Sequence, residues 1–147
     1  TGREAVLVDF GTGAVLDRLE ELGVDRVTDV LVTHHHRDGV QGLARAAAAG
    51  IRIWVPPVEE ELIADVSRRW QTRQLDNDYD IRQDRFSLLE DVPVTGTVDE
   101  YRTRRYGGVD VYTLPVPGHT VGSVHSSSGA LAPGARAGSS TSMSIVR

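Results

Sequence analysis

The sequence predicts an α/β domain with a mainly parallel sheet, and three observations support this prediction. Short apolar runs typical of buried strands alternate with segments whose apolar residues recur at helical spacing. Strand and helix repeated in this order imply right-handed crossovers onto a parallel sheet. The chain has 147 residues, which is enough for one domain with its own core but not for two ordinary ones.

The first part of the chain shows this alternation most clearly. The run Ala-Val-Leu-Val-Asp-Phe at 5–10 is typical of a buried strand, and it ends in a Gly-Thr-Gly turn. Asp9, at the end of this strand, is expected to hydrogen-bond the amides of the turn rather than to bind a metal. Further strands are predicted at 30–32 and 51–55, and helices at 15–22, 40–48 and 57–70.

The later part of the chain gives weaker signals. Residues 76–91 are polar and fit either a loop or a short helix, whereas strands are predicted at 92–98 and 109–116. Three arginines lie between Tyr101 and Tyr106, and we expect them on a solvated face.

From residue 126 onward the composition turns to serine, alanine, glycine and threonine. Such a stretch cannot bury enough surface to offset the entropy of ordering. We therefore predict a partial domain at 1–125 and a disordered or weakly packed tail at 126–147.

Composition excludes several classes of function. The net charge is −5, and all 16 basic residues are arginine. The absence of lysine removes mechanisms that need one, such as the P-loop and the Schiff base. The negative charge argues against a nucleic-acid partner and favours a small-molecule substrate. There is no cysteine, so any metal would need nitrogen and oxygen ligands.

The sequence shows no membrane span, because no apolar run approaches about 18 residues. A cytoplasmic location is therefore expected. The chain begins at Thr1 without a methionine. This start is compatible with an N-terminal piece that is removed or missing.

The segment 33–42 concentrates side chains that bind metals, with three histidines and an aspartate within five residues. On a helix, residues two apart point to different sides, so we expect an extended or turning loop. A solvated loop is the alternative interpretation, whereas a purification tag is disfavoured by the internal position. The predicted loop would point alternate residues the same way: His34, His36 and Asp38 to one side, His35 and Arg37 to the other.

A second candidate region lies far along the chain. His119 follows the predicted strand 109–116, where Pro117-Gly118 and Gly122 favour a sharp turn. A lone histidine after a glycine is more often structural than a ligand. However, sites in α/β sheets are built at strand ends, and the histidine loop also follows a strand. We therefore predict that the two regions share a metal site.

Three motifs carry a resemblance to a known family. They are Val-Leu-Val-Asp-Phe-Gly-Thr-Gly at 6–13, Val-Leu-Val-Thr-His-His-His-Arg-Asp-Gly at 30–39, and Leu-Pro-Val-Pro-Gly-His-Thr-Val-Gly-Ser at 114–123. Their order and the intervening elements resemble the metallo-β-lactamase-fold hydrolases, over residues 4–124. The resemblance implies an αββα sandwich, of which this chain holds most of the first half.

The resemblance also implies a metal site and a reaction. His34, His36 and His119 match the three ligands of the first metal. Asp38 matches the aspartate that binds a second metal or orients the attacking water, which makes it the predicted catalytic residue. We expect one zinc ion, against two in an intact relative, with iron or manganese as alternatives. The implied reaction is attack of water on an ester, thioester, amide or phosphoester of a small molecule.

The chain also departs from the family. Gly39 stands where a further histidine is usual, and no acidic residue follows Asp110 to supply the metal-bridging aspartate. His125 lies too close to His119 to match the family's later histidine. We therefore expect an incomplete sandwich. The alternative to an enzyme is a truncated or frame-shifted remnant that binds metal or a partner without turnover, and that self-associates through an uncovered sheet face.

Overall fold

The computed structural model describes residues 3–68, 87–128 and 144–146. Three sequence predictions fall partly outside these residues. They concern the end of the third helix at 69–70, most of the polar segment at 76–91, and the tail at 129–143.

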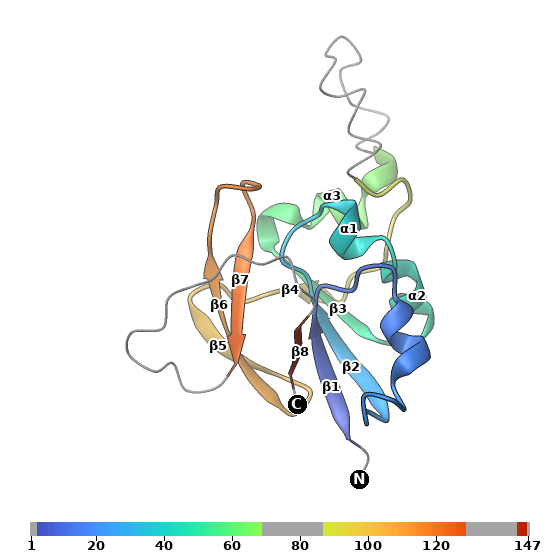
Figure 1. Ribbon diagram of the computed structural model, residues 1–147. Helices are drawn as coiled ribbons and strands as arrows, with labels where there is room; N and C mark the ends of the chain where they lie inside the picture. The colour runs from blue at the N-terminus through green and yellow to red at the C-terminus, as the bar shows by residue number, and fades with distance from the viewer. Residues whose placement is uncertain (1–2, 69–86, 129–143, 147) are drawn as a thin grey trace.

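A five-stranded sheet forms the centre of the fold, in the order β4-β3-β2-β1-β8 (Figure 1). Neighbouring strands are parallel except for β8, which runs antiparallel to β1. The predicted α/β fold with a mainly parallel sheet is confirmed. Strands β1, β2 and β3 carry most of its buried apolar residues, because the sheet is covered on both faces. The bounds are β1 (Glu4–Val8), β2 (Arg26–Leu31), β3 (Arg52–Val55), β4 (Gly96–Thr97) and β8 (Ser144–Val146).

The connections between these strands are short helices. In Figure 1 the N-terminal 3-10 helix and α2 lie on one side of the five-stranded sheet. The helix predicted at 15–22 is wrong in type and length, because only 14–18 are helical and the helix is 3-10. The helix predicted at 40–48 is two helices with a break at Gly42. The bounds are η1 (Ala14–Arg18), α1 (Arg37–Val40), α2 (Leu43–Ala48), η2 (Pro57–Glu59) and α3 (Glu61–Ala64).

A second, antiparallel sheet lies on the other side of the first (Figure 1). It contains β5 (Arg102–Tyr106), β6 (Val109–Pro115) and β7 (Val124–Ser128). The strand predicted at 109–116 is confirmed by β6, and Gly107 makes the tight turn before it at φ 54. The strand predicted at 92–98 is too long, because only β4 forms a ladder there.

Parts of the segment predicted as a tail form strands. Residues 126–128 complete β7, where they pair with β6. Residues 144–146 form β8, which pairs with β1. Backbone hydrogen bonding to a neighbouring strand can order such residues.

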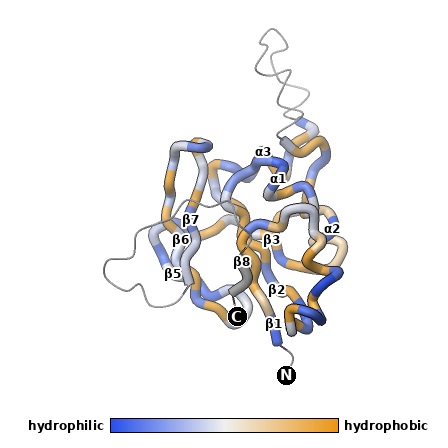
Figure 2. The backbone as a smooth tube through the Cα atoms, in the orientation of Figure 1, coloured by the Kyte–Doolittle hydropathy of each residue, from blue (hydrophilic) through white to orange (hydrophobic). Residues whose placement is uncertain are grey.

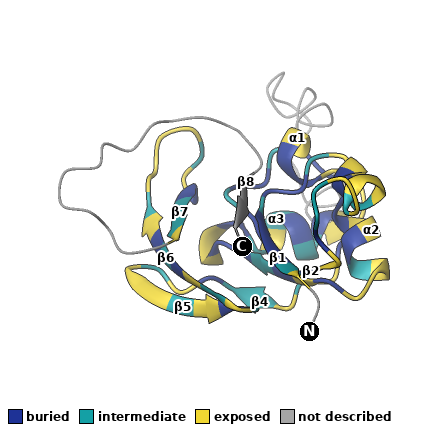
Figure 3. Ribbon diagram, turned by 60° about the horizontal axis from the view of Figure 1, so that its bottom comes forward, coloured by how far each residue is buried: buried dark blue, intermediate teal, exposed yellow. Residues whose placement is uncertain are grey.

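Two hydrophobic clusters form the core. The larger packs the helices on the five-stranded sheet, and the smaller brings together residues of both sheets. Figure 2 shows the apolar stretches running along β1, β2 and β3, and Figure 3 shows most of β1 and β2 buried or half-buried while much of β5 is exposed. The smaller cluster contains Val6, Leu31, Val98, Tyr106, Val111 and Val124.

The arginines of β5 are not simply a solvated face, as the sequence suggested. The guanidinium of Arg104 lies over the ring of Trp54, 4.2 Å from its centroid, and 5.3 Å from the centroid of Tyr106. The contact is a cation–π interaction between the two sheets. Within the described part of the chain, no helix is long and apolar enough to cross a membrane.

Candidate metal centre

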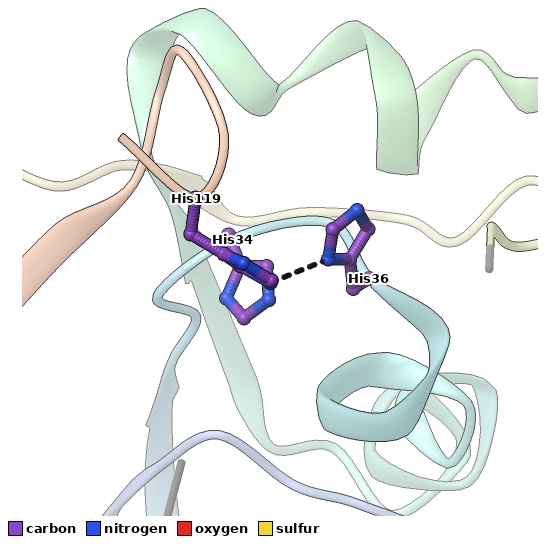
Figure 4. A group of neighbouring side chains, drawn as sticks. All are labelled: His34, His36 and His119. Atoms are coloured by element: carbon purple, nitrogen blue, oxygen red, sulfur yellow. Dashed lines mark hydrogen bonds between the residues drawn. The ribbon is translucent and has the colours of Figure 1, made fainter. Parts of the chain in front are cut away.

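Three histidines from distant parts of the chain meet at the carboxyl end of the parallel strands. His34 and His36 lie between β2 and α1, whereas His119 lies in the loop between β6 and β7. Their candidate ligand atoms, one from each ring, all lie within 4.8 Å of one another. Figure 4 shows the three rings gathered around one point. The end of β2 in the parallel sheet and the β6–β7 loop of the antiparallel sheet thus bring the two predicted regions together.

The rings meet edge to face. Their centroids are 4.6 to 4.9 Å apart, and Nδ1 of His36 lies 2.8 Å from Nε2 of His119 (Figure 4). The exposure of the three side chains to solvent differs: His34 is buried, His36 is half-buried and His119 is exposed. The centre is therefore closed on the side of the sheet and open on the side of His119.

A chain of hydrogen bonds orients His34. The amide and hydroxyl of Thr33 each donate to a carboxylate oxygen of Asp9, both at 2.8 Å. The same hydroxyl lies 2.8 Å from Nδ1 of His34. Since the hydroxyl's only proton goes to Asp9, Nδ1 of His34 must donate to it. The lone pair of His34 is then on Nε2, which is buried and has no hydrogen-bond partner among the described residues.

Asp9 acts differently from the sequence prediction. Its side chain bonds Thr33, on the loop after the neighbouring strand, rather than the amides of its own turn. Asp9 also has a positive φ of 57, which is uncommon outside glycine. Burial raises the pKa of its carboxyl, and the hydrogen bonds from Thr33 partly oppose this.

His34 and His36 are held in the neutral form that binds metals. Burial, followed by repulsion from His36 and His119, lowers the pKa of His34 to about 4. Burial and the neighbouring His35 and His119 also lower the pKa of His36. At neutral pH, each of these two imidazoles therefore presents a lone pair without first losing a proton.

Asp38 is not part of the compact group of candidate ligand atoms among the described residues. It is exposed in the first turn of α1, which begins at Arg37 directly after His36. The predicted loop, with His34, His36 and Asp38 on one side, is therefore wrong at its end. Asp38 nevertheless lies near enough to favour the charged forms of His34 and His36.

One neighbour of the site was not predicted from the sequence. Glu59, at the end of η2, is buried and accepts hydrogen bonds from both His35 and the His119 loop. Its own burial opposes ionisation, but hydrogen bonds from His35 and Thr120 outweigh this and lower its pKa to about 2. In sequence Glu59 stands in a run of three glutamates, a pattern typical of the first turn of a helix.

The arrangement fits a bound metal. Imidazole nitrogen is a good ligand for zinc, iron, copper and nickel. Three imidazoles around one point, one of them with a buried and unpartnered nitrogen, provide a ready set of donors. A buried polar atom without a partner is costly, and a metal ion would satisfy it.

Comparison with protein families gives one match. The family model described as the metallo-beta-lactamase superfamily matches residues 1–131. This range includes β1 to β7 and all three histidines of the site. No curated protein matches the chain.

Several solved structures have the same fold. A subclass B3 metallo-beta-lactamase from a soil metagenome library, MEM-A1, is 20% identical with a TM-score of 0.64, over 88% of this chain and 49% of its own. BJP-1 of Bradyrhizobium japonicum, also subclass B3, is 20% identical with a TM-score of 0.63, over 84% and 46%. A metallo-beta-lactamase of Cronobacter sakazakii is 22% identical with a TM-score of 0.60, over 81% and 46%. The chain spans about half the length of these structures.

Proposed function

The chain belongs to the metallo-beta-lactamase superfamily, and on this premise we propose that it is a zinc-dependent hydrolase centre built on His34, His36 and His119. One observation carries the proposal. The Nε2 atom of His34 is buried and unpartnered within the described residues, while its Nδ1 is engaged by Thr33. A histidine arranged in this way presents its lone pair to an ion, with the other nitrogen held by a neighbouring group.

We assign the surrounding residues from their positions. His119, the exposed member, lies where a substrate can approach the centre. When bound, zinc acidifies water to a pKa of about 7 and polarises a carbonyl or phosphoryl oxygen. Asp38 would take the proton of the attacking water or orient that water, consistent with its electrostatic proximity to His34 and His36.

The substrate we propose is a small molecule with an ester, thioester, amide or phosphoester bond. The formal charge of −5 and the absence of lysine make a nucleic-acid backbone a poor partner. We propose one zinc ion per chain, because the compact donor group contains three histidines. Iron and manganese are alternatives within the same proposal.

The first test is metal content after exhaustive dialysis. We expect about one zinc per chain, because three imidazoles leave one open position. His34→Ala and His119→Ala should lose it. The control is His125→Ala, which removes a histidine on β7 outside the candidate group. A wild-type chain that retains no zinc, or a His119→Ala variant that retains it fully, would contradict the proposal.

The second test is hydrolysis. The zinc-loaded chain is assayed with ester, thioester, lactam and phosphodiester substrates. Asp38→Asn should lower turnover by about 100-fold or more if Asp38 assists proton transfer. Its zinc content should remain that of the wild type if the three histidines alone hold the ion.

A second candidate function is metal binding without turnover. It is favoured by the compact group of candidate ligand atoms, which among the described residues contains three histidines and no carboxylate. In that case zinc is retained as above, but all four substrate classes remain unhydrolysed. Self-association of such a chain would appear as a dimer or larger species in sedimentation.

A further inference from the structure

The buried carboxylate of Glu59 connects the two parts of the metal centre. Only 2% of the residue is exposed, yet each oxygen has two hydrogen-bond donors. Oε2 accepts from the amide of His35 at 3.0 Å and from its ring Nδ1. Oε1 accepts from the hydroxyl of Thr120 at 2.7 Å and from the amide of Gly122 at 3.0 Å.

These donors belong to segments far apart in the sequence. His35 lies between the two histidines of the first loop, and Thr120 directly follows His119. Glu59 therefore holds the immediate neighbours of all three candidate ligands. A further contact between the same segments is the hydrogen bond from the amide of Val124 to the carbonyl of Thr33, at 3.0 Å.

The four donors require a carboxylate. An ionised carboxylate accepts hydrogen bonds at both oxygens and donates none. A glutamine at this position would turn an NH₂ group toward one pair of donors. The hydroxyl of Thr120 and the ring of His35 can each offer a lone pair instead, but the backbone amides of His35 and Gly122 cannot. Whichever way the glutamine lies, one buried N–H then faces another donor.

The packing around Glu59 is equally close. A Cβ added at Gly122 would lie 2.6 Å from Cγ of Glu59, so the loop approaches the side chain as closely as glycine allows. The hydroxyl of Thr120 also lies 2.6 Å from that of Ser123. Glu59 thus fixes the conformation of the loop, and not only its distance from the sheet.

We propose that Glu59 is a positioning residue, which holds the His119 loop against the first histidine loop so that the three imidazoles are assembled before an ion binds. The inference rests on the proposed metal function. Glu59 does not touch the candidate ligand nitrogens, and it acts through His35, Thr120 and Gly122. Groups outside the ligand shell that orient the ligands typically change metal affinity 10- to 100-fold when removed.

The test measures cobalt(II) affinity by competition with a chromophoric chelator, together with the visible absorption spectrum of the bound cobalt. We expect Glu59→Gln and Thr120→Val each to weaken affinity by about tenfold or more and to change the spectrum. Thr120→Ser should restore both, because it retains the hydroxyl. The control is Thr113→Val, which removes a buried hydroxyl that has no partner among the described residues.

A second readout needs no metal. In the metal-free protein, the amide of Gly122 should exchange its hydrogen about tenfold faster in Glu59→Gln and Thr120→Val than in the wild type, because its charged acceptor is lost or displaced. If Glu59→Gln does not fold, Thr120→Val and Thr120→Ser decide the question. An unchanged exchange rate in folded Glu59→Gln would overturn the proposal.

The outcomes separate this inference from the proposed function. Equal cobalt affinity and spectrum in the wild type, Glu59→Gln and Thr120→Val would overturn the positioning role alone. A wild-type chain that takes up neither zinc nor cobalt would overturn the metal function and the positioning role with it. Weakened affinity in Thr113→Val as well would show a general effect of destabilisation, and would also overturn the role assigned to Glu59.

Discussion

Thr33 and His34, neighbours in the chain, share a hydrogen bond of 2.8 Å between the hydroxyl and ring Nδ1. Because the hydroxyl gives its proton to Asp9, this bond selects the tautomer of His34. A tautomer fixed by a neighbouring group leaves one nitrogen as a permanent acceptor. The direction of the hydrogen bonds, as much as the position of the ring, therefore prepares His34 to bind metal.

Removing the hydroxyl of Thr33 should weaken metal binding. In Thr33→Val, Nδ1 of His34 loses its acceptor and the ring can adopt either tautomer. We expect zinc affinity to fall by about 10- to 100-fold, measured by chelator competition. Thr33→Ser retains the hydroxyl and should remain close to the wild type. Equal affinities in Thr33→Val and the wild type would show that the tautomer does not limit binding.

Exchanging Asp9 for asparagine should reverse the same hydrogen bonds. In Asp9→Asn, the amide oxygen can accept from the Thr33 amide, which leaves the NH₂ facing the Thr33 hydroxyl. That hydroxyl then donates to His34, and the proton of His34 moves to Nε2. Asparagine tolerates the positive φ at this position, so the fold should be retained.

The expected result for Asp9→Asn is a loss of zinc affinity of about 10- to 100-fold with little change in unfolding temperature. The ¹⁵N shifts of the His34 imidazole report which nitrogen carries the proton in the metal-free protein. Wild-type shifts together with wild-type affinity in Asp9→Asn would contradict this account of the site.

The sequence predicted the elements that carry strong local signals. The strand that leads into His34 is apolar because it is buried on both faces, and Pro117-Gly118 marks the loop that carries His119. These local features, placed at the ends of strands, were enough to predict that the two regions meet. Their role as metal ligands stays a prediction until metal is measured.

What the sequence missed depends on contacts between distant segments. Helix α1 starts at Arg37, so Asp38 lies in a helix and not in the predicted loop. The three histidines before it favour no particular structure, so the start of the helix could not be predicted from them. Glu59 looks like an ordinary residue of a charged helix start, and only the packing of the His119 loop gives it four donors. Local patterns carry no information about such partners.

Acid should destabilise the metal-free protein through His34. The unfolded chain binds a proton on this residue near its ordinary pKa of 6.5, whereas the folded chain resists protonation until about pH 4. Between these values the unfolded state binds more protons, so the free energy of unfolding falls as the pH falls. The contribution of His34 to this fall is about 3 kcal/mol.

Thermal unfolding of the metal-free protein from pH 7 to pH 4 measures this effect. His34→Gln removes the titrating group, so the unfolding temperature of this variant should depend less on pH over the same range. His125→Gln serves as the matched control, because it removes a histidine outside the site. A steeper or equal pH dependence in His34→Gln would contradict the assignment.

Gly42 should not tolerate a side chain. A Cβ there would lie 2.4 Å from the carbonyl carbon of Thr12 and 2.5 Å from the amide nitrogen of Gly13. Both are backbone atoms, so neither can rotate away. We expect Gly42→Ala to lower the free energy of unfolding by about 1–3 kcal/mol, measured by urea denaturation.

Gly108→Ala is the matched control for Gly42→Ala, because a Cβ at Gly108 would meet open space. Its effect should be within about 0.5 kcal/mol.

The comparison also bears on the metal centre. Gly42 follows the helix that begins directly after His36, and its amide donates to the carbonyl of Gly11 at 2.8 Å. A shift of this contact should move the start of α1, so zinc affinity should fall in Gly42→Ala and remain unchanged in Gly108→Ala.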